Sequence, residues 1–360
     1  MKIKQMCMLV LLWLGVIPAM QAQTFDKLWK EVEQAEKKSL PQTVIKLTGE
    51  IYQKGEMEKN SPQMLKAYMW RMKYRDMLTP DSLYTGLQEL KQWAKQADKP
   101  MDRAILHSLI AGMYADYAAN NQWQLRQRTE IAGEAPSADM REWTANMFVE
   151  KVRTNVKEAM ADSVLLLNTS SRTYIPFVEL GETSEYYHHD MYHLLASRSI
   201  EALQRIQGLD RTTPIEAYSE ETSSEKESLV KQDIERIYDQ MLTSYKAKGD
   251  KEGCLLTSLN YLNWKHGTSK SFREPFRVKK GGTYMTFDPY ETGLDALKTE
   301  YKSLDLCAEV YLAQANNAIG KEQETVALQL CDEAIRLYPG YRRINALKNL
   351  REDILAPSLN

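Results

Sequence analysis

The sequence has little of what catalytic and nucleic-acid-binding proteins depend on. Its 360 residues include only five histidines and four cysteines. Lys and Arg (47) nearly balance Asp and Glu (49), whereas a nucleic-acid surface needs a basic excess. The chain has no Gly-x-Ser-x-Gly elbow, no glycine-rich phosphate loop and no cysteine in a local catalytic pattern. We therefore expect a protein that is not an enzyme, uses no cofactor and binds no nucleic acid.

Long apolar runs are also scarce, and the one at the N-terminus is short. Lys2 and Lys4 precede an apolar run over residues 6–17, and small residues follow as far as Ala22. This order predicts a secretory signal peptide over residues 1–22, cleaved after Ala22. A membrane span would need about 20 apolar residues. Removing Lys2 and Lys4 with this segment leaves 45 basic and 49 acidic residues, a net charge of −4.

The cysteine count excludes a complete disulfide framework. Cys254, Cys307 and Cys331 remain after the signal peptide is removed, and an odd number cannot pair fully. The favoured interpretation is buried free thiols, and one bond between Cys307 and Cys331 stays open as an alternative. Stability must then come from an apolar core, which a chain of this length can bury.

What the chain does have is apolar residues at helical spacing along most of its length. Ser61-Pro62, Thr79-Pro80 and Pro100 mark helix starts about 20 residues apart, and short connections make neighbouring helices antiparallel. The predicted fold class is all-α, with antiparallel helical hairpins stacked as a tetratricopeptide-like superhelix. Five tryptophans fall mostly on the stripes expected to form the core: Trp29, Trp70, Trp93, Trp123 and Trp143.

The pattern also predicts how the chain is divided. We expect a helical-hairpin region at 23–208, a Ser-, Thr- and Glu-rich linker at 209–228, a helical region at 229–355 and a tail at 356–360 that could lead to a further domain. Within the first region, residues 168–184 are expected to form a loop, and a helix is expected from Glu185 to Gly208. Residues 277–287 surround Gly281-Gly282 and predict one small β-hairpin.

The most informative spacing lies near the C-terminus, at 308–341. A tetratricopeptide repeat is a 34-residue helix–turn–helix with small residues where its helices touch. Aligning its terminal proline with Pro339 places a turn at residues 320–322. The predicted packing positions are Tyr311, Ala315, Ala327, Ala334 and Pro339.

One segment has the residue types of a metal site. His189 and His193 are four residues apart, the spacing of a zinc-binding helix. Asp190 stands where a zinc protease has a longer Glu, and no third ligand is evident. We favour a packing role for these histidines and keep them as weak metal candidates. Tyr186, Tyr187 and Tyr192 are candidate surface-contact residues beside them.

The chain from residue 25 to 360 resembles the N-terminal helical region of alpha-2-macroglobulin family proteins of Bacteroidetes. The likeness is carried by FDKLWK at 25–30, LPQTVIKL at 40–47, NSPQMLKAY at 60–68, LTPDSLY at 78–84, RAILHSL at 103–109, DSVLLLNT at 162–169 and HDMYHLLA at 189–196. The resemblance implies a periplasmic helical module that precedes β-sandwich domains. It implies no protease trapping here, because this sequence has no Cys-x-Glu-Gln thioester motif.

Together these patterns favour an exported helical-repeat scaffold that contacts a protein partner or macroglobulin-like domains. A periplasmic glycan-binding helical-repeat protein with aromatic platforms is the alternative hypothesis. A metal-dependent hydrolase that uses His189 and His193 is a third.

Overall fold

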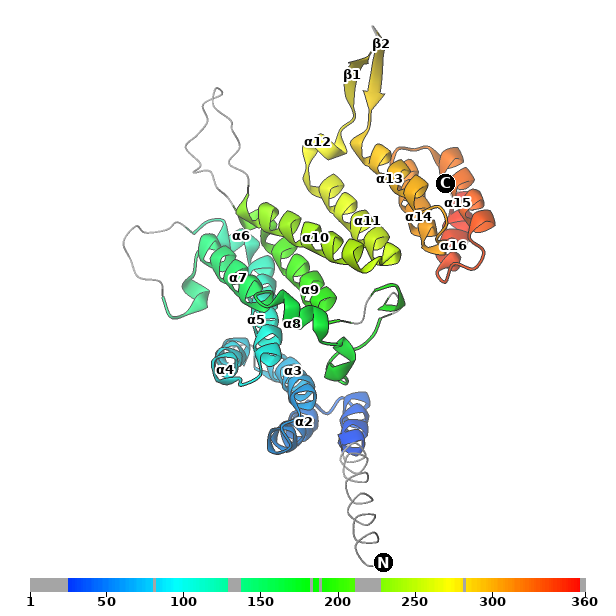
Figure 1. The fold of residues 1–360 in the computed structure, drawn as a ribbon. Coiled ribbons are helices and arrows are strands. Elements are labelled where there is room, and N and C mark those ends of the chain that lie inside the picture. Colours follow the sequence, from blue (N-terminus) through cyan, green and yellow to red (C-terminus); the bar gives the residue numbers. More distant parts are fainter. Residues whose placement is uncertain are drawn as a thin grey trace, which may run out of the picture. The chain divides into compact units, whose positions relative to one another are not determined.

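The computed structural model describes residues 25–79, 82–128, 137–181, 184–187, 190–210, 228–280 and 283–356. The chain divides into two compact units. The first comprises Met1–Ser184 and His189–Lys231, and the second comprises Glu185–His188 and Gln232–Asn360. Each unit is described separately below (Figure 1).

The first unit consists mainly of helices, and the connections between the first of them, up to α6, are short. A helix over residues 25–37 comes first. The α-helices after it are α2 (Pro41–Met57), α3 (Ser61–Leu78), α4 (Ser82–Gln96), α5 (Pro100–Asn120), α6 (Gln122–Leu125), α7 (Ala145–Ala159), α8 (Ser163–Asn168) and α9 (Met191–Ile206). Short 3₁₀ turns are η1 (Met140–Glu142), η2 (Ser171–Tyr174), η3 (Ser184–Tyr186) and η4 (Gln207–Leu209), of which η3 continues into the second unit.

The second unit is helical too, with one pair of strands. Apart from Glu185–His188, it begins within α10 (Leu229–Lys248). The elements that follow are α11 (Lys251–Thr268), α12 (Lys270–Arg273), β1 (Phe276–Lys280), β2 (Thr283–Phe287), α13 (Pro289–Glu300), η5 (Asp305–Cys307), α14 (Ala308–Gly320), α15 (Glu324–Leu337) and α16 (Ile344–Leu355). Among the described residues the only strands are β1 and β2, so the all-α class with one small β-hairpin is confirmed. No helix among the described residues is long and apolar enough to cross a membrane.

Helix starts largely follow the local sequence, with one shift. Pro62 and Pro100 lie in the first turns of α3 and α5, where a missing backbone N–H costs nothing. Ser61-Pro62 predicts the start of α3 with Ser61 as the capping residue, but the N-cap is Asn60, whose side chain accepts a hydrogen bond from the Gln63 amide at 3.3 Å. Ser61 is the first residue of the helix, which frees its hydroxyl for a tertiary contact.

That contact is a buried hydrogen-bond cluster around Asp102 in α5. The Ser61 hydroxyl donates to one carboxylate oxygen at 2.6 Å, and the Tyr174 hydroxyl donates to the other at 2.7 Å. Lys99 Nζ in turn donates to the Ser61 oxygen at 3.0 Å. The cluster joins α3, α5 and η2. It therefore anchors part of the predicted loop at 168–184, whose described residues include the 3₁₀ turn η2 and the start of η3.

Aromatic rings fill the space between α5 and α7. Phe148 is fully buried; its ring centroid lies 5.3 Å from that of Tyr117 and 5.4 Å from that of Trp143. Trp143 is thus in the core, as predicted. For Trp123 the core prediction is wrong, because 73% of its surface is exposed. It lies two residues before buried Leu125 in the single-turn helix α6, and positions two apart face opposite sides of a helix.

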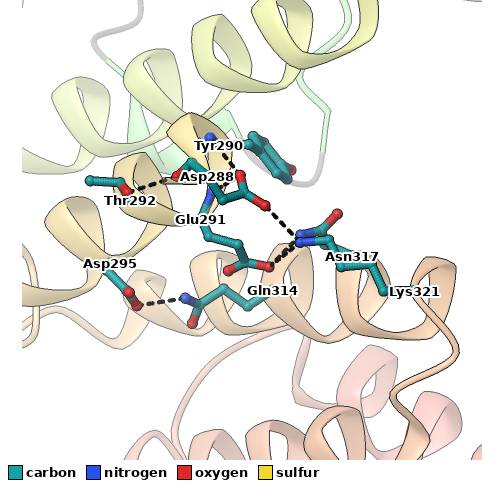
Figure 2. A network of polar contacts seen from close by, with 8 residues as sticks. All are labelled: Asp288, Tyr290, Glu291, Thr292, Asp295, Gln314, Asn317 and Lys321. Atoms are coloured by element: carbon teal, nitrogen blue, oxygen red, sulfur yellow. Dashed lines mark hydrogen bonds and ion pairs between the residues drawn. The ribbon is translucent and has the colours of Figure 1, made fainter. Parts of the chain in front are cut away.

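In the second unit, a polar network fixes the antiparallel pair α13 and α14. Asp288 caps α13 by accepting hydrogen bonds from the Tyr290 and Glu291 amides. Figure 2 shows Lys321, which follows the end of α14, reaching toward these acids at the start of α13. Its Nζ lies 2.8 Å from the Asp288 carboxylate and 3.3 Å from that of Glu291. The start of one helix therefore lies beside the end of the next.

All three described cysteines are free and buried, which confirms the favoured interpretation of buried thiols over a Cys307–Cys331 bond. Burial raises the pKa of each thiol above its ordinary value. Thiols held in the protonated form react slowly with oxidants and electrophiles, so these side chains act as small apolar residues in the core.

Candidate functional site

The predicted metal helix begins later than its sequence suggests. We expected it from Glu185, but α9 starts at Met191 and is capped by Asp190, whose carboxylate accepts a hydrogen bond from the His193 amide at 2.9 Å. The N-cap preference of Asp explains the shift. The carboxylate that would stand in the general-base position of a zinc protease is thus used to start the helix.

The two histidine candidates differ in what can be said of them. His189 lies outside the described residues. His193 is half-buried, and burial lowers the pKa of its ring to about 4, against a smaller opposing effect of the Asp190 charge. Among the described residues, no group of three or more His, Cys, Asp or Glu side chains is placed to hold a metal ion. The described residues therefore form no three-ligand metal site that includes His193.

His193 makes the folded protein sensitive to mild acid. Its pKa in the unfolded chain is about 6.5, so between pH 6.5 and 4 the unfolded state binds a proton that the folded state does not. Stability must therefore fall as the pH drops through this range. We expect His193→Gln to reduce the loss of unfolding free energy between pH 7 and pH 5 by roughly 1–2 kcal/mol. Urea denaturation of both proteins at the two pH values measures this, and an unchanged loss would contradict it.

The three candidate surface tyrosines do not share one environment. Tyr186 and Tyr187 are half-buried, and the Tyr187 ring lies 6.1 Å from that of Tyr245. Tyr192 differs from the prediction, because only 4% of it is exposed. It lies in the first turn of α9 on the face that also carries buried Leu195. Tyr192 is therefore a packing residue and offers no surface for contact.

The packing positions of the proposed repeat fall on the hairpin of α14 and α15. Four of them are buried: Tyr311, Ala315, Ala327 and Ala334. The fifth, Pro339, follows the C-cap residue Tyr338 and is exposed. The small side chains lie where the two helices approach, and the Tyr311 ring meets that of Tyr338 edge-on at 5.9 Å. These side chains therefore pack α14 against α15 and are not available to bind a partner.

Among the described residues, the β-hairpin is an element whose side chains are largely exposed to solvent. β1 and β2 pair antiparallel with Phe276 opposite Phe287 and Val278 opposite Met285. In Figure 1 the pair extends away from α12 and α13, which precede and follow it. Residues directly opposite in such a pair share a face, so Phe276, Phe287 and Val278 lie on one side.

That apolar face is open to solvent. Its three side chains are between 39% and 48% exposed, and the two phenylalanine rings contact each other at 5.1 Å between centroids. The opposite face is polar, with Lys279 paired with Tyr284 across the strands. An isolated two-stranded hairpin is marginally stable in water. An apolar face left uncovered on such an element is typical of a surface that meets a partner.

The sequence predicted the hairpin at 277–287 but gave it no role. One sequence signal points to this surface: Phe276 and Val278 alternate with basic residues. Such alternation gives a strand one apolar and one polar face, and the apolar face stays exposed when no other element packs on it. Gly281-Gly282, which prompted the prediction, lies outside the described residues.

Comparisons with protein-family models, curated proteins and solved structures give no match to this chain. The resemblance to the alpha-2-macroglobulin family therefore stays a prediction, as does the signal peptide, which lies outside the described residues.

Proposed function

We propose that this protein is an exported, non-catalytic helical-repeat scaffold that holds another protein domain, and that the β1–β2 hairpin is its contact surface. The observation that carries the proposal is the exposed apolar face of Phe276, Val278 and Phe287. Burying three such side chains would remove apolar area from water, at about 25 cal/mol per Å². The hairpin projects from the helices α12 and α13, which precede and follow it (Figure 1).

The hairpin also suggests what kind of domain it would meet. Within the described structure the sheet has only two strands, so β1 and β2 each pair on one side only. A further strand can add to such an edge through backbone hydrogen bonds, while alternate side chains supply specificity. A β-sandwich domain has strands of this kind at its own edges. This agrees with the β-sandwich domains that the family resemblance implies.

A capture experiment tests the proposal. The mature chain, immobilised, is presented with isolated β-sandwich macroglobulin domains and with cell-envelope extract. We expect saturable binding that weakens at least tenfold in Phe276→Ser/Phe287→Ser, because the pair of rings forms the centre of the apolar face. Helical content by circular dichroism should not change.

A matched control uses the polar face of the same hairpin. Lys279→Ser/Thr286→Ser alters residues whose side chains lie opposite the apolar face, and we expect it to bind as the wild type does. The wild-type chain binding neither macroglobulin domains nor any envelope protein would contradict the scaffold proposal. Equal losses in the two variants would contradict the assignment to the apolar face.

A further inference from the structure

A second candidate site lies in the first unit, in a cleft between α4, α5 and α7. Its volume is about 590 Å³, which is in the range of ligand-binding pockets. Part of the lining is apolar and buried, supplied by Ile110 and Tyr114 of α5 and by Trp143. Tyr84, Gln88, Lys91 and Lys95 of α4 also line it. Their spacing of four, three and four residues places them on a single helix face.

Three lysines meet at this cleft without acidic partners. Lys91 and Lys95 come from α4, and Lys151 comes from α7. Among the described residues, no Asp or Glu lines the cleft, and none forms an ion pair with these three amino groups. Burial, and then repulsion from Lys95 and Lys151, lowers the pKa of Lys91 below its ordinary value. Like charges are thus held together at an electrostatic cost that a bound anion would relieve.

The side wall of the cleft is fixed by its own hydrogen bonds. Asn155 of α7 donates through its amide nitrogen to the Lys151 carbonyl at 2.8 Å, which leaves its amide oxygen as an acceptor. His107 Nδ1 lies 2.8 Å from that oxygen, so this nitrogen carries the proton. The contact ties α5 to α7 without using an acid, and it brings no carboxylate to the three lysines. A ligand would therefore meet a preformed cationic wall.

The lysine spacing fits an extended peptide. Lys91 and Lys95 are four residues apart on α4, or about 6 Å along the helix axis. Alternate side chains of an extended chain repeat at about 6.6 Å on one side. We propose that this cleft binds an extended acidic peptide segment, with two carboxylates at alternate positions paired with Lys91 and Lys95 and a third reaching Lys151.

Two other anions fit the cleft less well. A charged glycan would stack on an open aromatic face, but Tyr114 and Trp143 are buried and pack on each other at 5.5 Å between ring centroids. The third ring of the lining, Tyr84, is half-buried, and the Arg141 guanidinium lies over it at 6.0 Å from the centroid. Phosphate groups favour the planar fork of arginine, and no arginine of the described residues lines the cleft. The separation of Lys91 and Lys95 along α4 matches two carboxylates on alternate residues of one extended chain, which a single phosphate group does not provide.

The test is binding of a fluorescein-labelled (Glu-Ala)₄ peptide to the purified full chain, followed by anisotropy at low salt. We expect saturable binding, at least tenfold weaker binding of the (Gln-Ala)₄ peptide, and weakening by added salt as charges are screened. The variant Lys91→Gln/Lys95→Gln/Lys151→Gln should lose at least tenfold in affinity. Its melting temperature should be no lower than that of the wild type, because the substitutions remove a repulsion.

The control removes the same charge from elsewhere in the first unit. Lys37→Gln/Lys38→Gln/Lys157→Gln replaces three exposed lysines outside the cleft and should bind the acidic peptide as the wild type does. Equal weakening in both triple variants, or tighter binding of citrate or oligogalacturonate than of the peptide, would overturn the proposal. The scaffold role is tested separately, because capture through the hairpin does not use these lysines.

Discussion

Replacing Phe148 with alanine is expected to lower the free energy of unfolding by about 3–5 kcal/mol, the range measured for buried phenylalanines. Phe148 is fully buried on α7. Its ring lies against Tyr117 and Trp143 and within 6.3 Å of Tyr114, centroid to centroid. Truncation would leave a cavity lined by three large rings, which cannot collapse into it without leaving their own contacts. Domains are commonly stable by only 5–15 kcal/mol, so the variant would be close to unfolding.

Urea denaturation followed by circular dichroism and by tryptophan fluorescence measures this loss. Trp123→Ala is the control, since it removes an even larger aromatic side chain that is mostly exposed on α6. We expect that substitution to change stability by no more than about 0.5 kcal/mol. A loss below about 1 kcal/mol for Phe148→Ala would show that the aromatic cluster is not the core of this helix pair.

The second large effect is expected at Asp102. The Asp102→Ala substitution should cost about 2–4 kcal/mol, because it leaves the Ser61 and Tyr174 hydroxyl groups buried without an acceptor. Both donors lie within 2.7 Å of the carboxylate oxygens. The acid also lies in the first turn of α5, where a negative charge is favoured by the helix dipole. Burial and the Asp102 hydrogen bond raise the pKa of Tyr174, which keeps its hydroxyl a donor.

Two further variants test whether the loss of stability comes from the buried Asp102 carboxylate and not from one of its donors or from net charge. Tyr174→Phe removes one donor together with its need for a partner and should cost only about 1 kcal/mol. Asp98→Ala removes an exposed acid from the connection between α4 and α5 and should be nearly neutral. If Asp98→Ala and Asp102→Ala destabilised the protein equally, the loss would reflect net charge and the buried cluster would have no special role.

Much of the fold could be predicted because local rules decide it. Pro62 and Pro100 mark helix starts, and the turn between α14 and α15 falls where the repeat alignment puts it, around residues 320–322. The start of α9 was misplaced by six residues because Asp190 outcompeted the upstream residues as a cap. Several nearby residues can cap a helix, and the one that does so depends on where the preceding segment has to join the helix in the folded chain.

The candidate sites were less predictable for a physical reason. The sequence identified Tyr192 and Trp123 as aromatic residues but assigned each to the wrong environment: one is buried and the other exposed. Helical periodicity defines a face without stating what covers it. The lysine cleft was missed altogether, since Lys91 and Lys151 are 60 residues apart and belong to different helices.

The sequence by itself determined the helical class, the position of the β1–β2 hairpin and the burial of the described cysteines. Each of these follows from short-range periodicity, turn residues or cysteine parity. Only the tertiary structure decided that Asp102 joins three segments, that the hairpin keeps an apolar face in water and that three lysines line one cleft to which the described residues contribute no acid. These features involve residues far apart in the chain. Packing of the helices decides which of their side chains meet, and local sequence preference has no influence on it.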